Sequence, residues 1–441
     1  MFDMLALIRV SYPLLLSCGD IMKISSSSGD AKDLSSKQKS HTTRYIFIFI
    51  IMFLSFYSIN LVGRFLLIEF LLLLVFLFHF FKGKIATTTK RLKPFVGLLI
   101  IAIIGQLIGD VISGTELKSM LKGFSLILFT LINLYGVSFL TKFRPLETKV
   151  ALLGYSLGGL AGFFLQPTTY ARSEIWKFGI GYPITLTVLL LISFPLSGGF
   201  RFLPVISLFL LSVVSLSLGA RSLALLVLLT LFFSNYKKSK GDFKNSRIVR
   251  TLIIISIVTF AFSSLYSRLA VNGSLGIKAQ SKYLAQTSAG GNLVINSRSE
   301  LIFAASGIAD SPLFGQGSYA KMNSELSLKT LNLLDSAGIH FDLAPLIRTY
   351  GDRIPVHSML LQWWLWFGAL GMLFPLRLSF LYFKSLSVRN REPVFYYLAL
   401  SGLWNVLLSP YGESFRILIP LTIVTLLSLG NSSQIDRASD E

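Results

Sequence analysis

The chain has 441 residues, of which 53% are hydrophobic and only 14% are charged, whereas a soluble globular domain carries about 25% charged residues. Its 41 Lys and Arg residues outnumber its 21 Asp and Glu residues, for a formal net charge of +20. The basic residues lie mostly in short connections between apolar stretches, a pattern typical of membrane proteins and not of nucleic-acid binding. The single cysteine, Cys18, excludes an internal disulfide and a cysteine-rich metal site.

The apolar stretches indicate an all-α integral membrane protein. Tyr45–Val62, Phe65–Phe81 and Phe124–Leu140 are each continuous runs of the length that crosses a hydrocarbon core, about 17–25 residues. Such runs lack the alternation of a transmembrane β-barrel. About twelve helices are expected. They are predicted at residues 45–63, 65–81, 95–113, 123–140, 149–166, 179–196, 202–218, 222–235, 250–266, 357–382, 394–409 and 416–430.

The basic connections predict the orientation of these helices. Alternating crossings put every Lys- and Arg-rich connection on one side, which the positive-inside rule makes the cytoplasm. These connections are residues 1–44, 82–94, 141–149, 236–250 and 383–393. A multi-pass protein of a bacterial inner membrane is expected, with helices one to nine in residues 45–266 and helices ten to twelve in residues 357–430. Both termini would be cytoplasmic: a tail of residues 1–44, disordered from residue 23, and a tail of residues 431–441.

The same alternation predicts that the turn Gly219–Arg221, the segment 267–356 and the connection Ser409–Arg416 lie together outside, as periplasmic elements. Segment 267–356 is much longer than a helix connection needs, and such loops are functional or disordered. Its helix-like run Leu301–Ile308 and its turn residues Asp310–Gly317 predict that this large periplasmic loop folds.

Three segments hold residues suited to chemistry. The first is Ser217–Ser222, whose Arg221 stands between two apolar runs. An arginine there is costly unless it reaches water or an anion. It would either snorkel to the membrane surface or grip a phosphate with its planar fork. The second is Asn296–Glu300, whose Arg298 either forms an ordinary surface ion pair with Glu300 or Asp310 or binds a ligand.

The third segment is Val356–Gly371, in which His357 stands where the long loop meets a helix. His357 would be either a helix cap or a proton-exchanging group. Trp363, Trp364 and Trp366 fit an aromatic belt at the membrane surface, and Gly368 and Gly371 would permit close packing against another helix.

Two acidic residues, Asp110 and Glu413, lie near predicted outer helix ends, where each would be a base or a solvated terminal charge. His340 and Asp342 are too few to predict a metal site. The sequence shows no phosphate-binding loop, no metal-spaced His and Cys cluster and no Ser-His-Asp signature.

Taken together, the three segments resemble the bacterial O-antigen ligase and O-antigen polymerase family. The matching features are the small-residue turn with Arg221, then Arg298 followed by the turn Asp310–Gly317, and then the run His357–Gly371. The resemblance covers roughly residues 200–375, and the twelve-helix layout extends it over the chain.

The resemblance implies a GT-C-like fold and glycosyl transfer from an undecaprenyl-diphosphate-linked glycan, with no metal and no cofactor. It assigns contact with the donor diphosphate to Arg221 and Arg298 and the catalytic histidine to His357. Membrane lipid and, for a polymerase, a chain-length regulator are the other partners it implies. Ser358 stands where many ligases have Asn.

Three functions remain open. A polymerase joins one lipid-linked repeat unit to another, whereas a ligase moves the finished glycan onto a lipid A core. The basic tail and Ser358 favour a polymerase. A polysaccharide or small-solute transporter is the alternative of another class. The uninterrupted helices, the lack of a visible relation between the two halves and the concentration of polar residues in one outer loop argue against it.

The topology is tested by reporter fusions at Gly241 and Asn323, which lie in connections predicted on opposite sides. We expect a cytoplasmic signal from the first and a periplasmic signal from the second. The same compartment at both sites would contradict the alternating topology.

Overall fold

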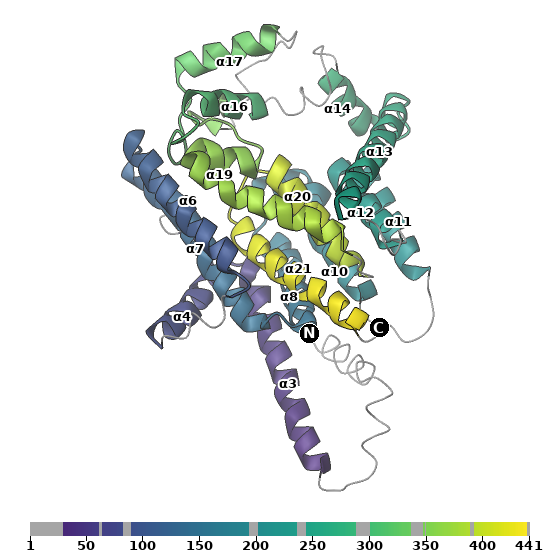
Figure 1. Cartoon of the computed structure of the whole chain (residues 1–441). Coiled ribbons are helices and arrows are strands. Elements are labelled where there is room, and N and C mark those ends of the chain that lie inside the picture. Colours follow the sequence, from purple (N-terminus) through teal and green to yellow (C-terminus); the bar gives the residue numbers. More distant parts are fainter. Residues whose placement is uncertain are drawn as a thin grey trace.

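The computed structural model describes residues 30–60, 64–82, 90–193, 202–235, 244–287, 300–336, 347–348, 350–388 and 392–438. This part of the chain is mostly helical, as expected for an all-α membrane protein (Figure 1). One small addition is an antiparallel hairpin of β1 (Ser58–Asn60) and β2 (Arg64–Leu66).

Each of the predicted ranges contains an apolar helix. The helices are α3 (Asp30–Phe53) with a 3-10 turn (Leu54–Phe56), α4 (Leu67–Phe81), α6 (Lys93–Ile112), α7 (Leu117–Thr141), α8 (Pro145–Leu165), the π-helix η2 (Ile175–Ile180) with α10 (Gly181–Ser193), α11 (Leu203–Ser217), α12 (Arg221–Asn235), α13 (Lys244–Val271), α19 (Met359–Leu386), α20 (Pro393–Leu408) and α21 (Phe415–Ala438).

Six helices in the described residues are long and apolar enough to cross a membrane. They are α6, α7, α8, η2 with α10, Ile253–Val271 of α13, and α19. The other apolar helices are shorter, so the expectation of twelve crossings goes beyond these six and stays a prediction.

Several helix boundaries differ from the prediction; α7, for example, begins at Leu117, and α13 spans Lys244–Val271. Two of the differences concern the predicted tails. α3 begins at Asp30, so residues 30–44 are helical and their predicted disorder is wrong. Once a helix has formed in the apolar residues, extending it into the adjoining polar residues costs little free energy. Residues 30–44 also hold the good helix formers Ala31, Leu34 and Gln38. At the other end of the chain, α21 continues past residue 430 to Ala438.

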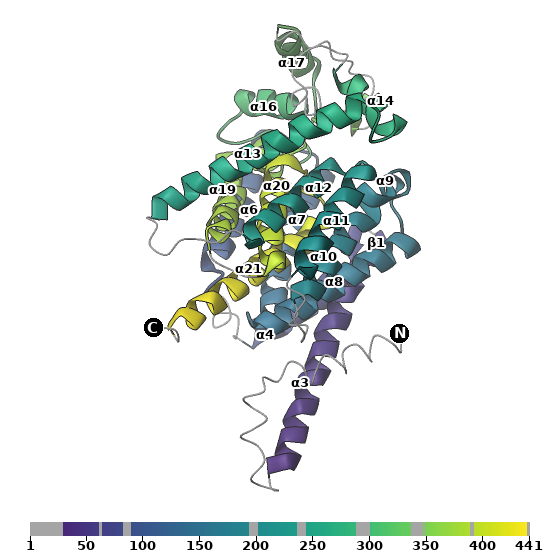
Figure 2. The same cartoon turned by 90° about the vertical axis from the view of Figure 1, so that its right-hand side faces the viewer.

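The connections predicted outside lie together at one end of the helix bundle, which we call the loop end. It also holds α9 (Thr169–Ser173), α14 (Ile277–Thr287), α16 (Glu300–Asp310) and α17 (Ser324–Ser336) (Figures 1 and 2). Contacts join the connections there: Lys321 Nζ lies 2.5 Å from Glu116 Oε1, and Arg64 lies 3.5 Å from Glu413. The prediction that the long segment folds is confirmed for its described part.

Close packing in the bundle depends on glycine. Gly154, Gly158 and Gly162 form a stripe on α8, and a Cβ on the first two would come within 2.5 Å of Phe49 O and 2.3 Å of Phe53 O of α3. Glycines spaced about one helical turn apart leave room for the backbones of two helices to approach closely.

A break divides α19 at Gly368, whose φ of 66° and ψ of −164° interrupt the helix. The loop after α16 docks at this break: Ala369 N donates to Leu313 O at 3.0 Å, and Gln316 N donates to Leu365 O at 2.6 Å. A Cβ on Gly368 would lie 2.1 Å from Leu313 O. Close packing does occur at Gly368, but the partner is a loop, so the prediction that this glycine packs against another helix is wrong.

The tryptophans of α19 make different contacts. Trp366 lies 4.5 Å from Tyr319 of the loop after α16, between ring centroids, whereas Trp363 packs on Phe374 and Tyr411. Trp363 and Trp366 are buried, at 0% and 7% exposure. Trp364 donates its indole N–H to Pro312 O at 2.8 Å. The interpretation of Trp363 and Trp366 as an aromatic belt is wrong, because these two rings pack inside the protein.

We expect Gly368→Ala to destabilise the protein strongly. The left-handed φ alone costs about 1–3 kcal/mol for a residue with a Cβ, and the clash with Leu313 O adds to that. The matched control is Gly97→Ala in α6, whose Cβ meets no atom within 4 Å. Thermal unfolding of both purified variants measures the difference, and equal Tm values would contradict the role of the break.

Candidate functional site

His357 lies immediately before α19, but it does not cap that helix. The N-cap is Ser358, whose Oγ accepts a hydrogen bond from Leu361 N at 3.3 Å. Because serine and asparagine are both good N-caps, Ser358 fills a structural role that asparagine would fill as well. The interpretation of His357 as a cap is wrong.

The imidazole of His357 lies among polar groups from the long segment. Its Nε2 is 3.8 Å from Glu300 Oε1, and the Tyr350 hydroxyl is 3.3 Å from Nδ1. Nδ1 also lies 3.2 Å from Val356 O. The Tyr350 hydroxyl also lies 3.4 Å from Nε2. With the Nδ1 proton donated to the Val356 carbonyl, Nε2 is the acceptor nitrogen of the ring, next to the Glu300 carboxylate.

Glu300 itself has spare hydrogen-bonding capacity. Its Oε2 is buried without a hydrogen-bond partner among the described residues, and its side chain is 21% exposed. Glu300 stands in the first turn of α16, where the helix dipole favours its negative charge. The pair of Glu300 and His357 therefore joins an unsatisfied carboxylate to a proton-accepting ring at the loop end.

Arg221 is the first residue of α12 and follows the turn in which Gly219 has a φ of 77°. Its guanidinium carbon lies 4.8 Å from the ring centroid of Tyr266 on α13. A cation stacked on a tyrosine face is held in one orientation. The side chain is half-buried at the loop end.

Arg298 lies outside the described residues, as do His340 and Asp342. The two carboxylates considered as ordinary partners for Arg298 have other contacts: Asp310 pairs with Lys329, and Glu300 approaches His357. The structure thus brings Glu300, two positions after Arg298, against the predicted catalytic histidine.

Asp110 is a buried anchor for the long segment. Its carboxylate accepts from Ser318 N at 2.5 Å, from Ser318 Oγ at 2.9 Å and from Gln106 Nε2 at 2.7 Å. The side chain is only 2% exposed. The interpretation of Asp110 as a solvated terminal charge is therefore wrong, and its carboxylate fixes the loop to α6.

Two further cations at the loop end were missed from the sequence. Lys122 Nζ and Arg353 Cζ lie 5.8 and 5.0 Å from the ring centroid of Tyr319, and burial raises the pKa of the Tyr319 hydroxyl. Arg353 precedes His357 by four positions, while Lys122 belongs to α7. No local pattern connects residues so far apart in the chain, so only the fold reveals the cluster.

A scan against protein-family models gives no match for this chain, and searches of curated proteins and of solved structures give none either. Within the described residues, no group of three or more His, Cys, Asp and Glu side chains is placed to hold a metal ion.

We expect Asp110→Asn to weaken the attachment of the long segment to α6. The substitution replaces one acceptor oxygen by an NH₂ group, which cannot accept the hydrogen bonds that Ser318 and Gln106 donate to Asp110. An unsatisfied buried group costs about 1–3 kcal/mol. A lower Tm and faster trypsin cleavage at Lys321 should result. Glu325→Gln, an exposed change on α17, is the control. Unchanged cleavage in Asp110→Asn would contradict the anchoring role.

Proposed function

We propose that the protein polymerises undecaprenyl-diphosphate-linked oligosaccharide repeat units into O-antigen or exopolysaccharide at the periplasmic face of a bacterial inner membrane. In this proposal the chain crosses the membrane about twelve times, the loop end is periplasmic and both termini are cytoplasmic. The fold would be GT-C-like. The chain's partners would be the lipid-linked glycan, membrane lipid and a chain-length regulator.

The observation that carries the proposal is the position of His357 against Glu300 and Tyr350. In the proposed reaction a hydroxyl of the acceptor sugar gives its proton to His357 Nε2 and attacks the anomeric carbon of the donor. The bond from that carbon to the phosphate oxygen breaks, and its electron pair leaves with the lipid diphosphate. Glu300 stabilises the imidazolium that forms.

The leaving diphosphate gains negative charge as the bond breaks, so cations aimed at it lower the barrier. Arg221 and Arg298 are proposed to hold it as bidentate forks. Lys122 and Arg353, which lie on the face of Tyr319 at the same end, add positive charge nearby. We propose that these cations replace a metal ion, so that the enzyme is a metal-independent glycosyltransferase.

An O-antigen ligase, which passes the glycan to a lipid A core, is the nearest alternative. The N-cap role of Ser358 removes one argument against it, since asparagine suits the same position. The basic N-terminal segment still favours the polymerase.

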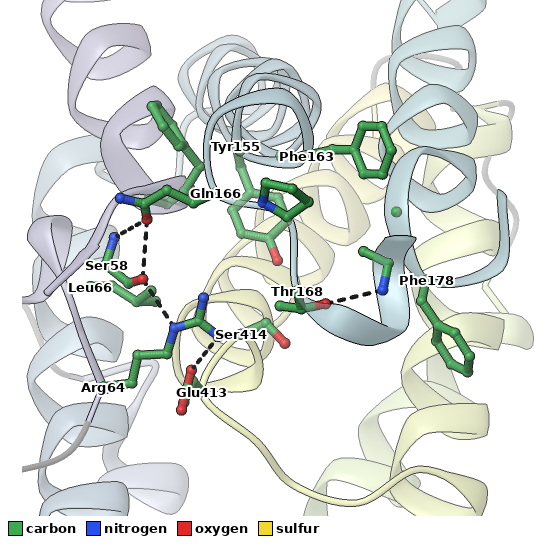
Figure 3. Close-up of a pocket in the computed structure, with 17 residues that line it drawn as sticks. Ser58, Arg64, Leu66, Tyr155, Phe163, Gln166, Thr168, Phe178, Glu413 and Ser414 are labelled. Atoms are coloured by element: carbon green, nitrogen blue, oxygen red, sulfur yellow. Dashed lines mark hydrogen bonds and ion pairs between the residues drawn. The ribbon is translucent and has the colours of Figure 1, made fainter. Parts of the chain in front are cut away.

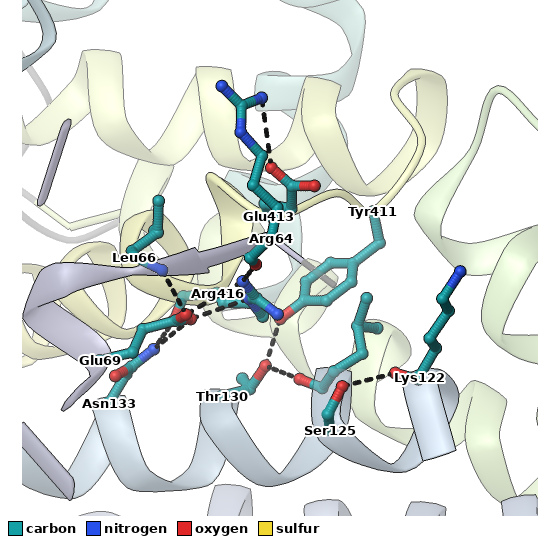
Figure 4. A network of polar contacts seen from close by, with 11 residues as sticks. Arg64, Leu66, Glu69, Lys122, Ser125, Thr130, Asn133, Tyr411, Glu413 and Arg416 are labelled. Carbon is teal, nitrogen blue, oxygen red and sulfur yellow. Dashed lines mark hydrogen bonds and ion pairs between the residues drawn. The ribbon is translucent and has the colours of Figure 1, made fainter. Parts of the chain in front are cut away.

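A transporter remains a second candidate, because the expectation of uninterrupted helices was wrong. α19 is broken at Gly368, and Glu69 is buried beside Arg416, with Nε 2.8 Å from Oε1 (Figure 4). Broken helices and buried charges are typical of transporters. Here, however, the loop at Leu313 fills the break and the two charges neutralise each other.

The experiment uses membranes that contain lipid-linked repeat units and measures the length of the glycan. His357→Gln should slow extension about 10²–10⁴-fold, and Arg221→Lys and Arg298→Lys should slow it about 10²–10³-fold, because lysine keeps the charge without the fork. Arg268→Lys, an exposed change on α13, is the control.

Wild-type extension in the three test variants, at normal protein level, would overturn the proposed site. Extension that stops in excess chelator and returns with Mg²⁺ or Mn²⁺ would overturn the metal-independent reaction.

A further inference from the structure

A pocket of about 230 Å³ opens at the loop end, apart from His357 (Figure 3). Its walls come from the 3-10 turn after α3, the β1–β2 hairpin, the second half of α8 with the residues that follow it, α9, η2 and the connection before α21. Its size suits one small molecule or a single sugar ring.

A chain of hydrogen bonds shapes one wall of the pocket. Arg64 Nε donates to Ser58 Oγ at 3.0 Å, and Ser58 Oγ and its backbone N–H both lie 3.3 Å from Gln166 Oε1. Arg64 Nη1 also lies 3.5 Å from Glu413 Oε2. Four residues from three separate connections are thereby fixed in place.

Several lining groups retain hydrogen-bonding capacity. Among the described residues, the Tyr155 hydroxyl and the Gln166 side-chain N–H groups have no hydrogen-bond partner, and both residues line the pocket. Glu413 contributes a carboxylate. Its pKa is raised, because desolvation by burial outweighs the lowering effect of Arg64. The pocket therefore offers donors, acceptors and a hydroxyl that can act as either.

The remaining lining is aromatic and small. Phe56, Phe163 and Phe178 face the space along with the ring of Tyr155, and Gly159, Gly162 and Gly179 leave room between them. A sugar ring presents apolar C–H faces and hydroxyl groups that both donate and accept, so it matches such a mixed surface.

Charge excludes the main competing occupant. A free phosphate or an anionic lipid headgroup would approach Arg64, but it would also meet the carboxylate of Glu413 beside it. The two charges sum to zero, whereas anion sites present an excess of positive charge. A neutral, hydroxyl-rich ligand avoids this repulsion and uses both partners of the ion pair.

We propose that this pocket is a carbohydrate site that binds one neutral sugar ring of a substrate glycan. The identity of that glycan as a lipid-linked repeat unit rests on the proposed function, while the sugar chemistry rests on the pocket alone. The site would hold the growing or incoming glycan at a distance from the reacting bond.

The test measures binding of the methyl glycosides of glucose, galactose and mannose by saturation-transfer NMR. The full-length protein is placed in phosphatidylcholine nanodiscs, because maltoside detergents carry sugar headgroups that would compete. Ser414→Phe adds a bulky ring at an exposed residue that lines the pocket, and its backbone carbonyl accepts from Leu418 N independently of the side chain. Tyr155→Phe removes only one hydroxyl. Ser324→Phe, at an exposed position at the start of α17, is the control.

We expect saturable binding of at least one glycoside to the wild type and to Ser324→Phe. Affinity should fall at least tenfold in Ser414→Phe and about three- to tenfold in Tyr155→Phe. Glycerol 3-phosphate, a probe for a lipid headgroup, should not compete.

Absence of saturable binding, equal binding by Ser414→Phe or displacement by glycerol 3-phosphate would overturn the proposal. The result is separable from the proposed function because no lipid-linked glycan is present in this assay. Sugar binding without glycan extension would count against the polymerase alone, and extension without sugar binding would count against this site alone.

Discussion

The loop end depends on how the break in α19 is closed. Where Gly368 interrupts the helix, backbone groups lose their partners, and in apolar surroundings each unpaired group costs several kcal/mol. The hydrogen bonds of Ala369 with Leu313 and of Gln316 with Leu365 restore partners at the break. Because they also fix the loop after α16, they hold the start of that helix, and Glu300 with it, close to His357.

Hydropathy was enough to predict the helices, because a long apolar run has few other ways to satisfy its backbone in lipid. It was not enough to predict where helices break. Gly368 was expected to permit packing, but a left-handed glycine inside an apolar run has the same hydropathy as a helical one. The burial of Trp363 and Trp366 follows from tertiary contacts with Tyr411 and Tyr319, so it too was not visible in the sequence.

The surroundings of the predicted site residues could not be read from the sequence, for a related reason. His357 was singled out because it stands at a helix start beside recognisable neighbours, but its neighbours Glu300 and Tyr350 reach it through tertiary contacts. Buried charges were missed in the same way. Glu69 and Arg416 are 347 positions apart, and each alone looks like a charge at a helix end. Pairing, with Leu66 N and Asn133 completing the hydrogen bonds of Glu69, is what makes their burial tolerable.

The connection 409–416 links the histidine to the proposed sugar pocket. Tyr411 N donates to Gln362 Oε1 at 2.6 Å in the first turns of α19, and the Tyr411 hydroxyl bonds Thr130 of α7. A few residues later, Arg416 is fixed by Glu69. Glu413, which lines the pocket, lies between these two attachments. The wall of the pocket is therefore held in a fixed position relative to the start of α19. In the proposed reaction, a sugar bound in this pocket would have little freedom to move relative to His357, and restricting motion before reaction lowers the entropic barrier to bond formation.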